Sequence, residues 1–158
     1  MDDQTFRTAM GKFATGVTVV TTQHGEDIHG MTANAFMSVS LNPKLVLISI
    51  DENATMLDFI NKSGKFAVSI LNEDQKDMSA YFAGQNKELK EVNFKWFNDM
   101  PTIEGSLASL TCEVYDSVIA GDHTLYIGKV TDIHTTKGDP LAFYEGKYRQ
   151  ISDCAEVK

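Results

Sequence analysis

The segment from Thr32 to Ser38 contains the residues best suited to chemistry. Thr32, Ala33, Asn34, Ala35 and Phe36 follow one another there, and the hydroxyl of Ser38 comes two residues later. Small side chains let a flat ligand approach the backbone, where amide groups can bind a polar ligand edge. The segment therefore suits a flat, largely apolar ligand, although the same residues also suit an ordinary strand.

A second candidate site is Asn53-Ala54-Thr55, at the predicted start of a helix over residues 53–61. The first amides of a helix lack intrahelical partners and can bind an anion such as phosphate. Lys65, which opens the next predicted strand, could add a positive charge. A plain helix cap at Asn53 is the alternative interpretation.

Several common sites are excluded by their missing motifs. No G-x-G-x-x-G follows a predicted strand, and no G-x-x-x-x-G-K-[ST] or G-x-S-x-G occurs. The histidines lack metal-binding spacing; they are His24, His29, His123 and His134. A site must then consist of backbone, hydroxyl groups and aromatic faces, which is what a flavin ring requires.

Composition limits the partners. The 158 residues, 42% of them apolar, are enough for one domain over 1–158. A net charge of −8 argues against a nucleic-acid partner. The longest apolar run, residues 45–50, is too short to cross a membrane, and the acidic start Met1-Asp2-Asp3 does not resemble a secretory signal, so we expect a cytoplasmic protein. Cys112, inside an alternating apolar pattern, is predicted to be buried.

Hydrophobic periodicity predicts a mainly β protein with helical additions. Predicted strands cover residues 17–22, 28–37, 44–51 (buried on both faces), 65–71, 110–115, 123–132 and 141–151. Predicted helices cover residues 3–14, with Phe6, Ala9, Met10 and Phe13 on one face; 53–61, capped by Asn53; and a stretch beginning at Asn72, which buries Met78, Tyr81 and Phe82. Residues 84–104 are expected to be irregular. Tight turns between strands favour a closed antiparallel barrel over a parallel sheet.

Motifs along nearly the whole chain resemble a known family. The stretch Gly11-x-Phe13-Ala14-Thr15-Gly16-Val17-Thr18-Val19-Val20-Thr21-Thr22 is similar to the opening signature of the short-chain NAD(P)H-dependent flavin reductases that serve two-component monooxygenases. Further matches follow in the family's order: Gly30 to Phe36, Ser38 to Pro43, Ser63 to Val68, Phe82-Ala83-Gly84, Gly121 to Thr124 and Gly146-Lys147-Tyr148.

The resemblance implies a split antiparallel β-barrel with Greek-key order, a homodimer that binds FMN or FAD. It places residues 32–36, Ser38 and Val39 along the flavin ring and ribityl chain, Asn53 to Thr55 near the phosphate, and Phe82 and Ala83 against another part of the flavin. His123 and Tyr148 match positions on the nicotinamide side. His123 also suits a solvent-facing strand residue.

The implied activity is hydride transfer from NADH or NADPH to the flavin, with reduced flavin passed to a partner monooxygenase. Ala35 and Asn53 stand where the family often has serine, so the preference between FMN and FAD stays open. A flavin-binding electron carrier without its own nicotinamide site is the alternative function.

Overall fold

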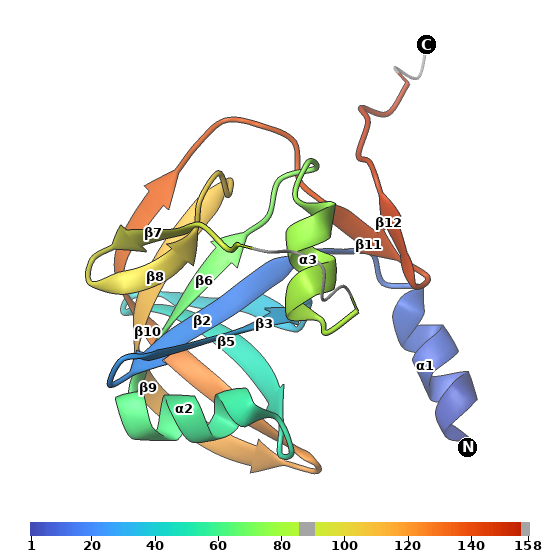
Figure 1. The fold of residues 1–158 in the computed structure, drawn as a ribbon. Coiled ribbons are helices and arrows are strands. Elements are labelled where there is room, and N and C mark those ends of the chain that lie inside the picture. The colour runs from blue at the N-terminus through green and yellow to red at the C-terminus, as the bar shows by residue number, and fades with distance from the viewer. Residues whose placement is uncertain (86–90, 156–158) are drawn as a thin grey trace.

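The computed structural model describes residues 1–85 and 91–155, which consist mainly of antiparallel strands (Figure 1). The helices are α1 (Asp3–Gly11), α2 (Thr55–Ser63) and α3 (Lys76–Phe82). The strands are β1 (Thr15–Gly16), β2 (Thr18–His24), β3 (Asp27–Ala33), β4 (Phe36–Leu41), β5 (Lys44–Asp51), β6 (Lys65–Ile70), β7 (Phe94–Phe97), β8 (Met100–Ile103), β9 (Ala108–Ala120), β10 (His123–Thr135), β11 (Ala142–Tyr144) and β12 (Lys147–Arg149).

Seven strands form one sheet in the order β3-β2-β6-β9-β10-β5-β4, and every neighbouring pair is antiparallel. Six antiparallel steps make the two edge strands, β3 and β4, run in the same direction. These edges are also consecutive in the chain, joined only by Asn34 and Ala35, which we call the seam. The sheet therefore curls into a split β-barrel with Greek-key order, as the sequence predicts.

The seam corrects the prediction of one strand over residues 28–37. The predicted strand is interrupted at Asn34 and Ala35: β3 pairs with β2, while β4 pairs with β5. Phe36 N–H donates to Asn34 O at 3.0 Å, and Ser49 N–H donates to Ala35 O at 3.3 Å. The chain changes partners here without reversing direction, so no turn residue marks the change.

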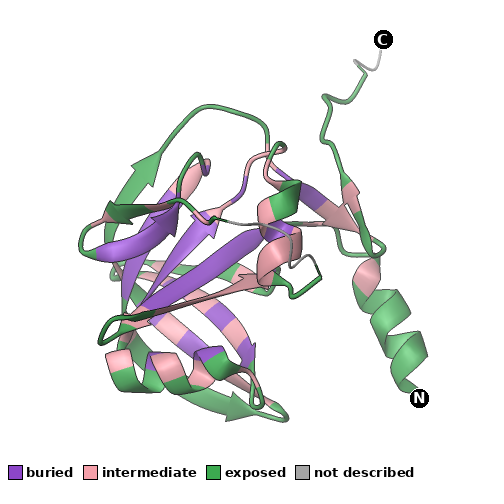
Figure 2. Cartoon of the chain, viewed as in Figure 1, coloured by how far each residue is buried: buried purple, intermediate pink, exposed green. Residues whose placement is uncertain are grey.

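The barrel interior holds the larger core cluster, which includes Val20, Ile48, Phe66 and Tyr126, all no more than 2% exposed. A second cluster, including Val19 and Leu71, lies outside the barrel wall. Because β2 separates the two, Thr18 to Thr22 are all buried (Figure 2). Their hydroxyls are satisfied by backbone carbonyls; for example, Thr18 Oγ1 donates to Ala33 O at 2.7 Å.

β5 differs from the prediction of a strand buried on both faces. Val46, Ile48 and Ile50 are buried, whereas Leu45 and Leu47 between them are only half-buried. β5 is the neighbour of edge strand β4. In the described part of the chain, no second layer covers the outer face of β5. Leu47 consequently remains available to line a pocket.

α1 is shorter than the helix predicted over residues 3–14, and its apolar face is not buried. It ends at Gly11 and buries none of its residues, and Phe6 and Met10 are each 56% exposed. The helix projects away from the barrel (Figure 1). Its C-terminal end is tied to the β11–β12 turn by an ion pair between Lys12 and Glu145, and Glu145 N–H donates to Gly11 O at 3.1 Å.

The predicted helix caps are wrong in position. α2 begins at Thr55 with Ala54 as its N-cap, and Asn53 lies in the turn before it, where its N–H donates to Asp51 Oδ1 at 2.7 Å. α3 begins at Lys76 rather than at Asn72. The Gln75 side chain does bind the Asn72 amide at 3.0 Å, as a capping box would, but in the turn before the helix.

The burial predicted for α3 is wrong too, because Met78, Tyr81 and Phe82 are only half-buried and the buried residue of this helix is Ser79. The α3 helix packs outside the barrel wall, where Met78 and Phe82 meet only the smaller cluster.

Two further predictions miss hairpins. Residues 94–103, expected to be irregular, form the β7–β8 hairpin, whose turn residues Asn98 and Asp99 both have positive φ. Residues 86–90 of the same stretch lie outside the described residues. The strand expected over 141–151 is the β11–β12 hairpin, which turns at Glu145-Gly146, again with positive φ. Within the described ranges, no helix is long and apolar enough to cross a membrane.

Gly128 tests the packing of the barrel wall. A Cβ added there would overlap the Phe66 ring and lie 2.9 Å from Cys112 Cβ. We expect Gly128→Ala to lower the free energy of unfolding by about 1–3 kcal/mol, measured by urea denaturation. Gly16→Ala is the control, since a Cβ added at Gly16 meets nothing within 4 Å and the φ of this residue is not positive; equal losses in both variants would contradict the packing.

The two thiols test burial directly. Burial raises the pKa of Cys112 to about 12, whereas Cys154 is exposed. Only the thiolate reacts with Ellman's reagent, so at pH 8 the folded protein should show one fast thiol and, in denaturant, two. Two fast thiols in the folded protein would contradict the buried position of Cys112.

Candidate functional site

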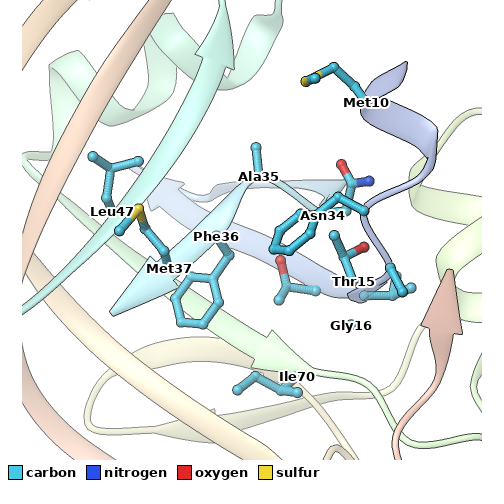
Figure 3. A pocket seen from close by; sticks show the side chains of 13 residues that line it. Met10, Thr15, Gly16, Asn34, Ala35, Phe36, Met37, Leu47 and Ile70 are labelled. Atoms are coloured by element: carbon cyan, nitrogen blue, oxygen red, sulfur yellow. The ribbon is translucent and has the colours of Figure 1, made fainter. Parts of the chain in front are cut away.

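A pocket of about 690 Å³ opens beside the seam, and we call it the seam pocket (Figure 3). Asn34, Ala35 and Phe36 form one wall. Residues from other elements complete it: Met10, Phe13, Thr15, Gly16, Met37, Leu47 and Ile70. The volume suits a ligand of cofactor size, and the lining is mostly apolar.

The seam provides polar groups at this apolar pocket. Asn34 O and Ala35 O each accept a backbone hydrogen bond, but among the described residues nothing accepts a hydrogen bond from Asn34 N–H or Ala35 N–H. Both residues are exposed, so these amides face solvent or a ligand. Two backbone donors beside small side chains form the arrangement that the sequence suggests for a flat ligand with a polar edge.

Thr15 adds a buried polar atom to the same pocket. Within residues 1–85 and 91–155, its Oγ1 is buried and has no hydrogen-bond partner. Buried hydroxyls without partners are uncommon in folded proteins. A flavin fits this donor set: its ring is flat and apolar, and its carbonyl and nitrogen atoms lie along one edge that the seam amides can bind.

A smaller pocket of about 250 Å³, which we call the tyrosine pocket, adjoins the first. Thr32, Asn34, Ala83 and Tyr148 are among its lining residues, and Asn34 lines both pockets. The Tyr148 ring packs edge-on against Phe143, with centroids 5.6 Å apart. The structure therefore brings four of the predicted site residues together.

His123 lies elsewhere, with the predicted phosphate segment. In the β10–β5 pairing it is opposite Asp51, and Glu52 N–H donates to Asp122 O at 2.9 Å. Asp122 Oδ1 accepts a hydrogen bond from His123 Nδ1 at 2.8 Å, and this bond lowers the pKa of Asp122 below its usual value. The ionised carboxylate fixes the imidazole orientation and leaves Nε2 available to a ligand. His123 and Tyr148, predicted together, line no common pocket in the described part of the chain.

The N-terminus of α2 lies beside His123. Because Asn53 N–H is bound to Asp51, the available donors are the first amides of α2 and the Thr55 hydroxyl, and no side chain of the described residues caps this helix. Ala54 packs against the barrel core. Lys65 follows the C-terminal end of α2, about 13 Å of helix away at 1.5 Å per residue. The structure therefore does not bring the Lys65 backbone to the phosphate segment.

The remaining predicted residues lie outside both pockets. Ala33 is buried in the barrel core. Phe82 packs on the backbone of Gly30, where a Cβ would come within 2.8 Å of its ring, and so positions α3 rather than lining a pocket. Ser38 and Val39 are exposed on β4, where the register with β5 shifts between Ser38 and Ser40.

Sequence reasoning missed several residues of the seam pocket. Met10 and Phe13 have core-like helical spacing, so the pattern assigns them to packing. Thr15 and Gly16 stand where the predicted helix gives way to a strand, and only their closeness to Asn34 in space brings them to the site. Ser79, which lines the tyrosine pocket, was missed as well, because a single serine in an amphipathic helix gives no sequence signal.

The chain is similar to known proteins over most of its length. Residues 10–152 match the model of the flavin reductase like domain. A NADH-dependent flavin reductase from a Rhodococcus species is 48% identical over 148 residues, covering 92% of this chain and 84% of that protein. The reductase component of 4-hydroxyphenylacetate 3-monooxygenase from Thermus thermophilus is 38% identical, covering 94% and 96%.

Solved structures have the same fold. A flavin reductase in its native state superposes with a TM-score of 0.95 at 57% identity, covering 97% of this chain and all of that one. A NADH:FAD oxidoreductase from Streptomyces globisporus, in complex with NAD and FAD fragments, has a TM-score of 0.91 at 34% identity, covering 98% and 96%. The chain belongs to the flavin reductase family.

Proposed function

We propose that residues 1–158 act as one flavin reductase domain, which transfers a hydride from NADH to FMN or FAD and supplies reduced flavin to a monooxygenase. The main support for this proposal is the seam. There, two backbone amides that have no partner among the described residues border an apolar pocket, in a chain of the flavin reductase family. Relatives named as NADH-dependent flavin reductases and as reductase components of monooxygenases support the same activity.

The flavin ring is assigned to the seam, with Thr32, Asn34, Ala35 and Phe36 beside it. Ser38 and Val39 continue this surface along β4 toward the ribityl chain. The phosphate is assigned to the start of α2 at Thr55, with Asn53 and Ala54 leading into it. Ala83, which Phe82 holds in position, is assigned to another part of the flavin, on the side of the tyrosine pocket.

A bound flavin would accept the hydride from the nicotinamide, so the protein needs no nucleophile of its own. The residues of this chain orient the two ring systems and exclude water. Tyr148 contributes a phenol to the tyrosine pocket, next to the seam. His123, fixed by Asp122, provides Nε2 near the α2 terminus, where it would bind a phosphate or diphosphate group. Lys65 keeps only an electrostatic role, from the far end of α2.

A homodimer is part of the proposal. Several large apolar side chains lie exposed on or next to α1 and β4: Phe6, Met10, Phe13, Met37, Val39 and Leu41. Monomers rarely leave so many apolar groups in water. A second copy of the chain would cover these faces, which border the seam pocket through Met10, Phe13 and Met37.

The rival function is a flavin-binding electron carrier without a nicotinamide site. NADH absorbance at 340 nm, followed with added FMN, FAD or riboflavin, separates the two. We expect oxidation of NADH that depends on added or bound flavin. A protein that holds flavin but oxidises neither NADH nor NADPH would be the carrier, and the reductase assignment would be wrong.

Ala35 tests the position of the flavin ring. Ala35→Leu fills the seam pocket without disturbing the core, since Ala35 is exposed. We expect the Kd for FMN, measured by quenching of flavin fluorescence, to rise at least about tenfold, because a loss of 1.4 kcal/mol is tenfold. Ala155→Leu, the same change in the exposed C-terminal segment, is the control. Unchanged FMN affinity in Ala35→Leu would place the ring elsewhere.

His123 tests the dinucleotide assignment. A hydrogen bond to a charged group contributes about 1.5–3 kcal/mol, so His123→Ala should raise the KM for NADH roughly tenfold or more, with FMN affinity changed less than about twofold. Asp122→Asn keeps the imidazole but removes its anchoring charge, and should give a smaller increase. His24→Ala, at the exposed end of β2, is the control. An unaltered NADH KM in His123→Ala would exclude the role of this residue.

A further inference from the structure

Ser79 is the buried residue of α3, with 1% of its surface exposed. It touches two residues of the tyrosine pocket through different atoms. Its carbonyl oxygen accepts a hydrogen bond from the Thr32 hydroxyl at 2.6 Å, and its own hydroxyl lies 2.8 Å from the phenol oxygen of Tyr148. Ser79 thus joins β3, on one side of the pocket, to β12 on the other.

The first of these bonds fixes how Thr32 can act. The Ser79 carbonyl also accepts Ala83 N–H at 3.0 Å, so it already completes the last turn of α3. The single hydroxyl proton of Thr32 is committed to that carbonyl. Toward the pocket, Thr32 consequently has only lone pairs to offer and acts as an acceptor.

The second bond, between the Ser79 hydroxyl and the Tyr148 phenol, makes Tyr148 a hydrogen-bond donor toward the pocket. By geometry alone, either hydroxyl could donate. Among the described residues, the Tyr148 phenol is the one hydrogen-bond partner of the Ser79 hydroxyl, so a proton on Ser79 would be buried without an acceptor if Tyr148 donated. Buried donors without partners are strongly disfavoured. Ser79 therefore donates, and the phenolic proton of Tyr148 is free to point into the pocket.

The Tyr148 ring is held in place from another side as well. Lys76 Nζ lies 5.6 Å from the ring centroid, which positions the ring without using its hydroxyl. Thr32 and Tyr148 line the same pocket of about 250 Å³. The pocket thus presents one acceptor and one donor, both set by Ser79, which lines the same pocket and is 1% exposed.

We propose that Ser79 is a positioning residue that presents Tyr148 as a hydrogen-bond donor to the nicotinamide and Thr32 as an acceptor to the flavin. This rests on the proposed reductase function. The nicotinamide carboxamide has the carbonyl that a phenol donor needs, and the imide N–H of a flavin is the donor that Thr32 can accept. Ser79 acts on the nicotinamide side through its hydroxyl, and on the flavin side through its carbonyl.

Because the hydroxyl and the carbonyl of Ser79 act on different ligands, a substitution of its side chain should change the affinity for NADH but not the affinity for FMN. Ser79→Ala removes the hydroxyl and keeps the carbonyl, so the KM for NADH should rise about three- to tenfold, the range expected for one neutral hydrogen bond. The Kd for FMN, from fluorescence quenching, should change less than twofold. Ser79→Thr retains a hydroxyl and should restore much of the NADH affinity.

A double-mutant cycle with Tyr148→Phe tests whether Ser79 acts through the phenol. Tyr148→Phe should raise the NADH KM by at least as much as Ser79→Ala, and the double variant should be no worse than Tyr148→Phe alone. Ser106→Ala is the matched control: Ser106 is also a buried serine, but its hydroxyl binds Ile103 O at 2.9 Å and it lines neither pocket. It should leave KM and Kd unchanged. Titration of the FMN-loaded protein with NAD⁺ gives the same comparison without turnover.

The possible results distinguish the positioning role of Ser79 from the proposed reductase function. Additive effects in the cycle, a KM in Ser79→Ala equal to that of the native protein, or an effect of Ser106→Ala as large as that of Ser79→Ala would each overturn the role of Ser79. A Tyr148→Phe variant with native NADH KM and NAD⁺ affinity would overturn both this role and the assignment of Tyr148. Absence of NADH oxidation by the native protein would instead contradict the proposed function, and then unchanged FMN and NAD⁺ binding in Ser79→Ala would overturn the role of Ser79 independently.

Discussion

The structure depends on one connection: two residues, Asn34 and Ala35, must link the opposite edges of a seven-stranded sheet. Three peptide steps from Ala33 to Phe36 cover at most about 10–11 Å, so the end of β3 and the start of β4 cannot lie further apart than that. A flat sheet of this order would place its edges several times farther apart, since neighbouring strands are about 4.8 Å apart. The sheet must therefore curl, and its interior fills with the larger core cluster.

The same constraint explains why the binding site lies where it does. The chain leaves one strand partner and reaches the next at the seam, so the amides of Asn34 and Ala35 belong to neither ladder. Unpaired edge amides elsewhere would favour aggregation. Here they border the seam pocket, to which α1 and β1 also contribute residues and to which we assign the flavin ring. The contacts that form the barrel therefore also form the seam pocket.

The helices position the ends of the site. α2 closes the lower end of the barrel as drawn (Figure 1). Ala54 leaves its N-terminus without a side-chain cap, and in the proposed function this terminus is the local device by which an acidic protein binds phosphate. α3 joins β3 to β12 through Ser79. A net charge of −8 makes such local devices necessary, because no broad positive patch is expected to attract the ligand.

Much of this could be predicted from the sequence where local chemistry decides. Gly64, a residue type that commonly ends helices, closes α2 in the left-handed conformation, Gly121 has a positive φ in the turn before His123, and Cys112 is buried as predicted. The partner change at the seam could not be predicted, because neither Asn34 nor Ala35 is a glycine or a proline and β4 continues in the direction of β3. The exposed face of α1 has the spacing of a core helix, and the pattern does not say whether the apolar partner belongs to the same chain. Ser79 matters only through contacts that the fold creates.

The most direct test of the seam is a crystal structure of the protein with FMN and NAD⁺ bound. We expect the polar edge of the flavin ring to lie within about 2.7–3.2 Å of the amide nitrogen of Asn34 or Ala35, the range of N–H···O hydrogen bonds. The ring plane would then lie in the pocket between β1 and β4. A flavin ring bound elsewhere, with both seam amides still facing solvent, would contradict the central claim.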